Sequence, residues 1–164
     1  MNQENLSHKC RPVGHCNTLL EKLESAVIDY EIRLTILELG DTKCNTADSY
    51  RALRKYLFTN FRHQTLIAMA EIEYYSAIDI IIGLLRRERN REQNENTVDA
   101  LACIFTERID YAGPEKFLSE LDNFSTLELN LRGKFYNALR DGVQLSSVRD
   151  IEDYLKKARS ILFI

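Results

Sequence analysis

Turn-forming residues are scarce in this chain, because its 164 residues include only two prolines and six glycines. A β protein needs a turn after each short strand, and glycine and proline supply many of the backbone conformations that such turns require. Here the few glycines and prolines fall between long segments whose apolar residues repeat at helical spacing. The sequence therefore predicts an all-α fold, a single compact bundle of six or seven helices.

The size and composition of the chain are those of one globular domain. A chain of this length buries roughly two thirds of the surface that it exposes when unfolded, so it needs no disulfide or metal to fold. Its residues are 45% hydrophobic and 29% charged, which is far from the composition of disordered proteins. We expect an irregular N-terminal leader over residues 1–16 and one helical domain over residues 17–164.

Charge and cysteine content indicate where such a protein works. The formal net charge of -3 gives no overall basic field toward nucleic acid or an anionic membrane. No segment is apolar for long enough to cross a bilayer, and the first fifteen residues lack the apolar core of a secretory signal. The four cysteines have no regular spacing, which indicates free thiols in a reducing compartment. These features predict a cytoplasmic protein without a membrane partner.

Two apolar rows mark the first predicted helix, which begins after Asn17 or Thr18 and stops at Gly40. A helix with two such rows is expected to contact more than one neighbour. The first row alternates steps of three and four residues, as in helices that pack nearly parallel. It comprises Leu20, Leu23, Val27, Tyr30, Leu34 and Leu37, and the second comprises Ile28, Ile32, Ile36 and Leu39.

A second helical pattern runs from about Asp48 to Arg91 and is too long to be one helix in a compact chain of this size. We expect it to break at Thr59–Thr65, and its second half, Ile67 to Leu84, to form the most buried helix. A polar connection is predicted over Arg86–Thr97. Capping signals predict that further helices begin at Thr97, Pro114, Ser125 and Ser146.

The stretch HKCRPVGHC, His8–Cys16, is the richest in metal-binding side chains. Structural zinc is normally held by two pairs of ligands with two to four residues between the members of a pair. Here His8 and Cys10 are one residue apart, and His15 and Cys16 are adjacent, so the spacing favours an irregular leader without metal. Two alternatives stay open: a redox pair of the two cysteines, or a zinc site completed by Cys44 or His63.

A basic cluster, RRERNRE, follows the predicted buried helix and contains Arg86, Arg87, Arg89 and Arg91. Four arginines at a helix end can contact a few phosphates. However, glutamates lie among them, the helix dipole favours arginine in a last turn, and no interleaved aromatic residues are present to stack bases. The cluster predicts a salt-bridged helix end, with a nucleic-acid-binding regulator as the alternative.

Aromatic residues gather in one helical region, at Tyr56, Phe58, Tyr74 and Tyr75. Because Phe58 and Tyr75 fall off the main apolar row, part of this area is expected to reach the surface, where aromatic residues are enriched in protein interfaces.

The sequence contains no Ser-His-Asp arrangement, phosphate loop or zinc-protease motif, and it therefore predicts no catalytic residue, metal or cofactor. We expect a non-enzymatic regulatory module that binds another protein, or a second copy of itself as a homodimer, through a helix groove or an aromatic face. The alternatives are the nucleic-acid-binding regulator and an enzyme with a cryptic site between helices.

Overall fold

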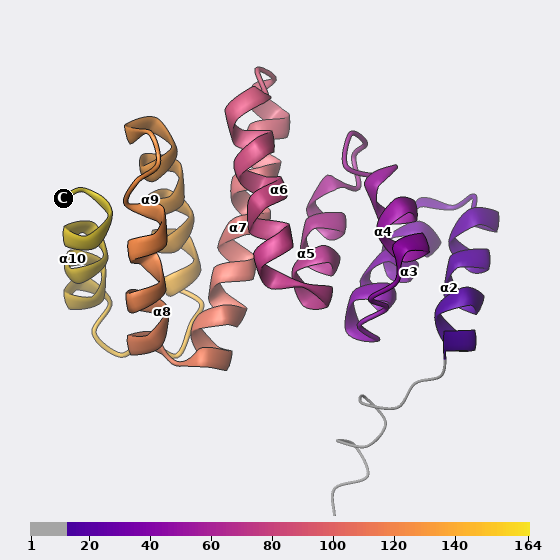
Figure 1. Ribbon diagram of the computed structural model, residues 1–164, viewed down its shortest axis with the longest axis horizontal. Helices are drawn as coiled ribbons and strands as arrows, with labels where there is room; N and C mark the ends of the chain where they lie inside the picture. The colour runs from indigo at the N-terminus through magenta and orange to yellow at the C-terminus, as the bar shows by residue number, and fades with distance from the viewer. Residues whose placement is uncertain (1–12) are drawn as a thin grey trace, which may run out of the picture. The chain divides into compact units, whose positions relative to one another are not determined.

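The computed structural model describes residues 13–164, and this part of the chain contains nine α-helices, one short 3-10 helix and no strand (Figure 1). The all-α prediction is confirmed for these residues, whereas the predicted count of six or seven helices is too low. None of the helices within 13–164 is both long enough and apolar enough to cross a membrane. The elements are α2 (Val13–Ser25), α3 (Asp29–Asp41), α4 (Ala47–Arg54), α5 (Arg62–Ile72), α6 (Tyr74–Arg87), α7 (Arg91–Ala112), α8 (Pro114–Glu120), η1 (Leu121–Phe124), α9 (Leu129–Val143) and α10 (Ile151–Leu162).

The chain divides into two compact units, one up to Ile80 and the other from Ile81 onward. The division falls inside α6, so the range predicted as one helical domain, 17–164, contains parts of both units. At the N-terminal side, α2 begins at Val13, and residues 13–16 are therefore helical although the sequence assigned them to an irregular leader.

The first predicted helix is in fact two helices, α2 and α3, separated at residues 26–28. Ile28 has extended backbone angles, φ -87° and ψ 130°, and the acidic residues Asp29 and Glu31 occupy the first turn of α3, where the helix dipole favours them. The step from Leu23 to Val27 keeps the helical spacing across this break. The apolar row therefore carried no sign of the break, and only the acidic first turn did.

The second helical pattern breaks twice. A turn over residues 55–61 separates α4 from α5 and overlaps the predicted break, and the extended backbone of Glu73 then separates α5 from α6, so the predicted buried helix is also two helices. The polar connection is much shorter than predicted, because the Asn90 side chain caps α7 by accepting from the Gln93 amide, 3.1 Å away. Thr97 caps nothing, since it lies buried inside α7.

Later boundaries follow glycine and proline more closely than serine. Gly113, with φ +96°, ends α7, and Pro114 opens α8, as predicted. In contrast, α9 begins at Leu129 rather than at Ser125, and α10 begins at Ile151, where the Asp150 carboxylate accepts from the Asp153 amide. Serine caps were therefore the less reliable signal.

In the first unit α3 packs along α5, while α2 lies against α3, and α4 contacts both α2 and α5. The backbones of α3 and α5 come close at Gly40, where a Cβ atom would lie 2.7 Å from the Cα of Ala68. The buried side chains Ile36 and Leu39 of α3 face the same core as Leu66 and Met69 of α5.

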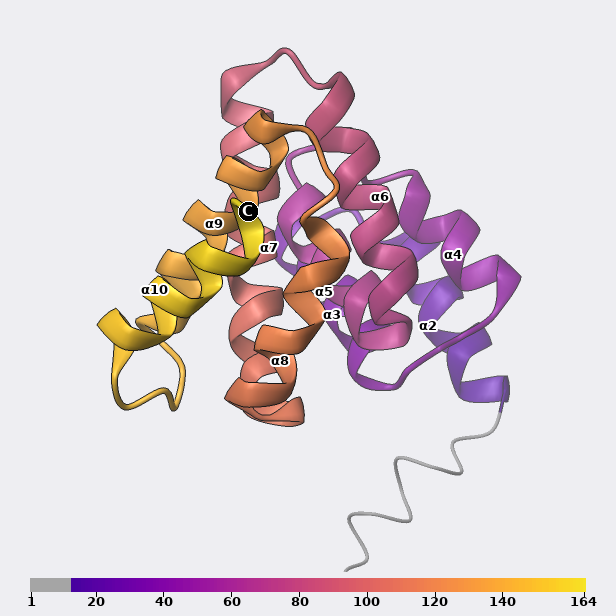
Figure 2. The ribbon, with the colours of Figure 1, turned by 60° about the vertical axis from the view of Figure 1, so that its left-hand side comes forward.

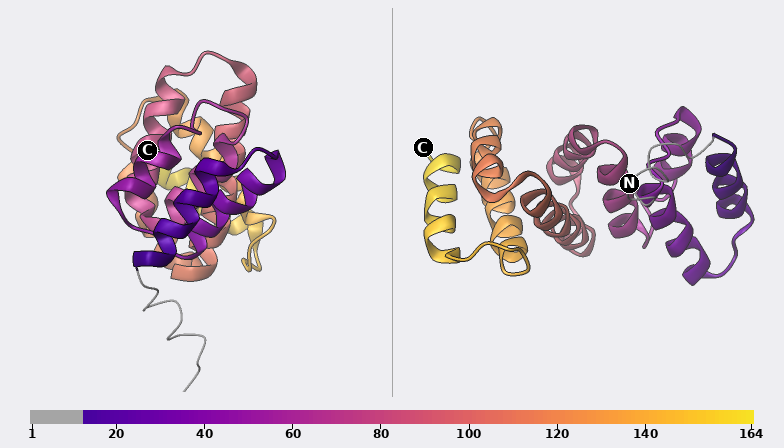
Figure 3. Two further views of the ribbon diagram at one scale, coloured as in Figure 1. Left: turned by 90° about the vertical axis from the view of Figure 1, so that its right-hand side faces the viewer. Right: turned by 90° about the horizontal axis from the view of Figure 1, so that it is seen from below.

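In the second unit α9 runs along α7, and α8 also lies against α7 (Figure 2). Helix α10 lies beside α9 (Figure 3). Phenylalanines from four elements form the core, with ring centroids 5.1 Å apart for Phe105 and Phe117, 5.8 Å for Phe105 and Phe135, and 4.8 Å for Phe124 and Phe135. The backbones of α7 and α9 come close at Gly142, where a Cβ atom would lie 2.6 Å from the backbone oxygen of Ala102.

Two glycines of α9 provide a matched test of this packing. Gly142→Ala is expected to lower the free energy of unfolding by about 1–3 kcal/mol, because α7 and α9 must move apart. Gly133, in the same helix, has no atom within 4 Å of the Cβ position, so Gly133→Ala is expected to raise the free energy by about 0.5–1 kcal/mol through helix propensity. Urea unfolding of both variants measures the difference, and equal effects would contradict the close contact.

The stability of the second unit depends on pH through Tyr154. Its buried hydroxyl donates to the backbone oxygen of Pro114 at 2.8 Å, and burial, with a contribution from the Glu115 carboxylate, raises the pKa of Tyr154. The folded state therefore holds the phenolic proton to higher pH than the unfolded state does, and the stabilisation present below about pH 10 is lost as pH rises further.

We expect the free energy of unfolding to fall above about pH 10, with Tyr154 contributing a slope of about 1.4 kcal/mol per pH unit. Tyr154→Phe should remove that contribution and, at neutral pH, cost about 1 kcal/mol for the lost hydrogen bond. Tyr111→Phe, at an exposed position, is the control and should keep the full slope. Unfolding at a series of pH values measures these slopes, and the same slope in both variants would contradict this role of Tyr154.

Candidate interaction surfaces

An apolar stripe covers the solvent face of α3 and the turn before it. We define the α3 stripe as Val27, Ile28, Tyr30 and Leu34, whose residues are 87%, 62%, 69% and 46% exposed. Four exposed large apolar residues within eight positions are unusual, since exposed apolar residues on soluble proteins are normally scattered. The sequence had assigned Val27, Tyr30 and Leu34 to a helix-packing row.

The later residues of the second row form the core instead, whereas Ile28 of that row is exposed and belongs to the stripe. Ile36 and Leu39 are fully buried, and Gly40 faces α5 at contact distance. The two rows have equal apolar character in the sequence, and the glycine decides between them because only its side of α3 can approach another helix backbone closely. The α3 stripe is therefore left facing solvent.

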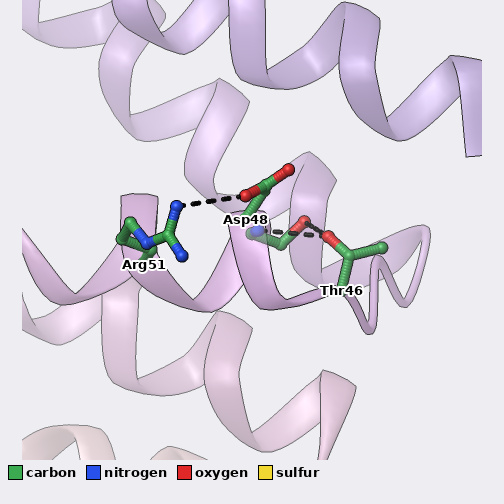
Figure 4. A network of polar contacts seen from close by, with 4 residues as sticks. Thr46, Asp48 and Arg51 are labelled. Carbon is green, nitrogen blue, oxygen red and sulfur yellow. Dashed lines mark hydrogen bonds and ion pairs between the residues drawn. The ribbon is translucent and has the colours of Figure 1, made fainter.

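A groove of about 490 Å³ lies between α2 and α4 in the same unit. Its apolar lining includes Leu20, Leu23 and Tyr56, and its charged rim includes Asp48 and Arg51. The rim pair is close, with Arg51 Nη1 3.3 Å from Asp48 Oδ1 (Figure 4).

The cap of α4 fixes one end of this groove. The Thr46 hydroxyl oxygen accepts from the Ser49 amide at 3.1 Å and lies 2.8 Å from the Ser49 hydroxyl (Figure 4). Such a cap satisfies a backbone donor that the first helical turn otherwise leaves open. Asp48 lies in the first turn of this capped helix and at the groove rim.

The four predicted aromatic residues take part in three separate contacts, one with an arginine and two between rings. Phe58 is 73% exposed, and its ring lies over the buried Arg62 guanidinium, 5.5 Å from its centroid to Cζ. Tyr56 is half-buried and packs edge-on against Phe61. Tyr75, 57% exposed, packs edge-on against the half-buried Tyr74 at 5.2 Å. Phe58 and Tyr75 are thus the rings that present most of their area to solvent, and Phe58 also covers a buried charge.

The predicted basic cluster spans the end of α6 and the start of α7, and its four arginines are exposed. Arg89 and Arg91 join Lys134 of α9 around a depression of about 370 Å³ that Glu95 and Asp99 also line. Arg91 Nε lies 3.0 Å from Glu95 Oε1, and Lys134 Nζ donates to the backbone oxygen of Leu85 at 3.3 Å. One of the four arginines, Arg91, therefore has a carboxylate partner at this depression.

Lys134 is the member of this cluster that sequence analysis missed. Lys134 is more than 40 residues from the arginines in sequence, and the residues next to it form no basic motif. Only the packing of α9 on α7 brings it to the cluster.

The cysteines differ from their predicted state, because Cys16 and Cys44 form a disulfide. Both are buried, with Cα atoms 5.7 Å apart, and the bond joins α2 to the turn before α4. The expectation of free thiols is wrong for this pair, and neither sulfur remains to bind zinc. Within residues 13–164 no group of three His, Cys, Asp or Glu side chains is arranged to hold a metal, and His8 and Cys10 lie outside the described residues.

Comparison of this chain with known protein families, curated proteins and solved structures gave no match. The surfaces described above are therefore the basis for the functional proposal.

The disulfide predicts that stability depends on redox state. It closes a loop between residues 28 apart, and chain entropy for a loop of that size gives about 3.5 kcal/mol of stabilisation. We expect urea unfolding to show a loss of that order when dithiothreitol is added. A Cys16→Ser/Cys44→Ser variant should have the unfolding free energy of the reduced protein, and dithiothreitol should not change it. A wild-type protein that is equally stable with and without dithiothreitol would contradict the bond.

Proposed function

We propose that this chain is a non-enzymatic regulatory module that binds another protein through the α3 stripe. The observation that carries the proposal is the exposure of four large apolar residues within the eight positions 27–34, on one helix and the turn before it: Val27, Ile28, Tyr30 and Leu34. Large apolar side chains gain roughly 25 cal/mol for each Å² of apolar surface removed from water. A contiguous apolar patch of this kind marks an interaction site on a soluble protein.

The other surfaces support binding less strongly. The groove between α2 and α4 has a rim of both charges, of which Asp48 and Arg51 pair with each other. Phe58 has a structural role above Arg62, which accounts for an aromatic ring at an exposed position. In the basic cluster Arg91 pairs with Glu95, so a nucleic acid has fewer cations to contact than the sequence suggested.

We also propose a cytoplasmic location. Thiol reductants in that compartment reduce most protein disulfides, and the burial of Cys16 and Cys44 restricts the access of those reductants to this bond.

A photo-crosslinking amino acid at position 30 tests the binding surface in a lysate of the native cell. We expect an adduct with a protein at position 30 that disappears when Leu34→Ser is added, and no such adduct from a probe at Glu21, an exposed position on α2. Because both sites are exposed, the variants should keep their unfolding free energy within about 0.5 kcal/mol. The same adducts from both positions, or an adduct that Leu34→Ser leaves unchanged, would count against the α3 stripe.

A further inference from the structure

We infer that the partner segment bound by the α3 stripe is an amphipathic helix whose apolar face is flanked by basic residues. This inference rests on the proposed function and specifies the chemistry of the partner. It follows from the charges that lie around the stripe and from the spacing of the apolar residues within it.

The solvent face of α3 has a defined order of side chains. At 100° per residue, Tyr30 and Leu34 of the stripe and the half-buried Leu37 beyond it lie along one line of the helix, opposite the core side that bears Ile36 and Leu39. Tyr30 and Leu34 are four residues apart, and Leu34 and Leu37 are three apart. This alternation is the spacing that receives the side chains of a second helix lying alongside.

Acidic residues border this line. Glu31 and Glu38 are seven residues apart, and so they lie on the same flank of the line, one above the other. Asp41, at the last position of α3, adds a third carboxylate at the end where the helix dipole is negative. A helix that binds here therefore meets negative potential along one side.

The opposite flank contributes little positive charge. Its one cation is Arg33, whose guanidinium carbon lies 5.7 Å from the centroid of the Phe61 ring and so already has a cation–π contact within the chain. The α3 helix as a whole has four acidic residues and one basic residue, Asp29, Glu31, Glu38 and Asp41 against Arg33. Electrostatic complementarity selects a partner with basic residues beside its apolar face.

A second copy of this chain fits the same surface poorly. An antiparallel pair of α3 helices places the flank bearing Glu31 and Glu38 against its own copy, and like charges in that position oppose binding. A parallel pair sets Arg33 alone against two glutamates. A partner with two basic residues seven positions apart satisfies both glutamates.

Fluorescence anisotropy with two synthetic peptides of about 18 residues tests the inference, a length at which an alanine-rich helix begins to be stable. Both carry leucine at the seam positions and alanine elsewhere, with lysine on the flanks of one and glutamate on the flanks of the other. We expect the lysine peptide to bind the full chain at least about tenfold more tightly than the glutamate peptide, and less tightly as salt is raised.

Two double variants locate the binding site. Glu31→Gln/Glu38→Gln is expected to weaken binding of the lysine peptide by about threefold to thirtyfold, the range that two charge pairs at the rim of an interface give. Glu21→Gln/Glu152→Gln removes the same charge from exposed positions on α2 and α10 and should leave the affinity unchanged. Tyr30→Ser/Leu34→Ser should abolish binding, and circular dichroism melts check that each variant is folded.

Each other result overturns the inference in a distinguishable way. Equal weakening by both charge variants would mean general attraction to an acidic protein, and equal binding of the two peptides would mean that flank charge does not select the partner. A wild-type dimer in analytical ultracentrifugation that Tyr30→Ser/Leu34→Ser dissociates would identify a second copy as the occupant, while protein binding by the stripe would stand. If neither peptide binds and position 30 crosslinks no protein, the proposed function itself is wrong.

Discussion

Helix pairs that meet at a glycine hold each unit of this chain together. Gly40 brings α3 against Ala68 of α5, and Gly142 brings α9 against Ala102 of α7, in both cases too closely for any side chain carbon at the glycine position. Close backbone approach lets the side chains around each glycine interdigitate over a larger area and at crystal-like density. It also fixes the rotation of each helix about its own axis.

The exposed α3 stripe depends on that rotation. With Gly40 toward α5, the row containing Ile36 and Leu39 must enter the core, and Tyr30 and Leu34 must face away from it. The exposed apolar side chains of α3 are thus a direct consequence of helix packing in the first unit. An apolar face that residues 13–164 leave exposed is available to a partner at no cost in core packing.

The Cys16–Cys44 disulfide adds a second constraint on the same unit. It joins α2 to the turn that leads from α3 to α4. The groove described above is lined by residues of the same two helices, α2 and α4. Loop closure restricts mainly the unfolded chain, so the bond supports α2 without requiring extensive contacts from it. Reduction of the bond is therefore expected to lower the stability of this unit mainly by freeing the unfolded chain.

The amino-acid sequence alone determined the helical class, the stop at Gly113 and Pro114, and the presence of two apolar rows in the first helical region, because turn chemistry and periodicity are local properties. It also placed four arginines at a helix end, where they are found exposed. Tertiary structure decided which apolar residues of α3 are buried, since both rows are apolar and the fit of Gly40 against Ala68 places Ile36 and Leu39 inside and Tyr30 and Leu34 outside. It likewise brought Lys134 to the arginines and Cys16 to Cys44, because contacts between residues far apart in sequence depend on how helices pack rather than on any local pattern.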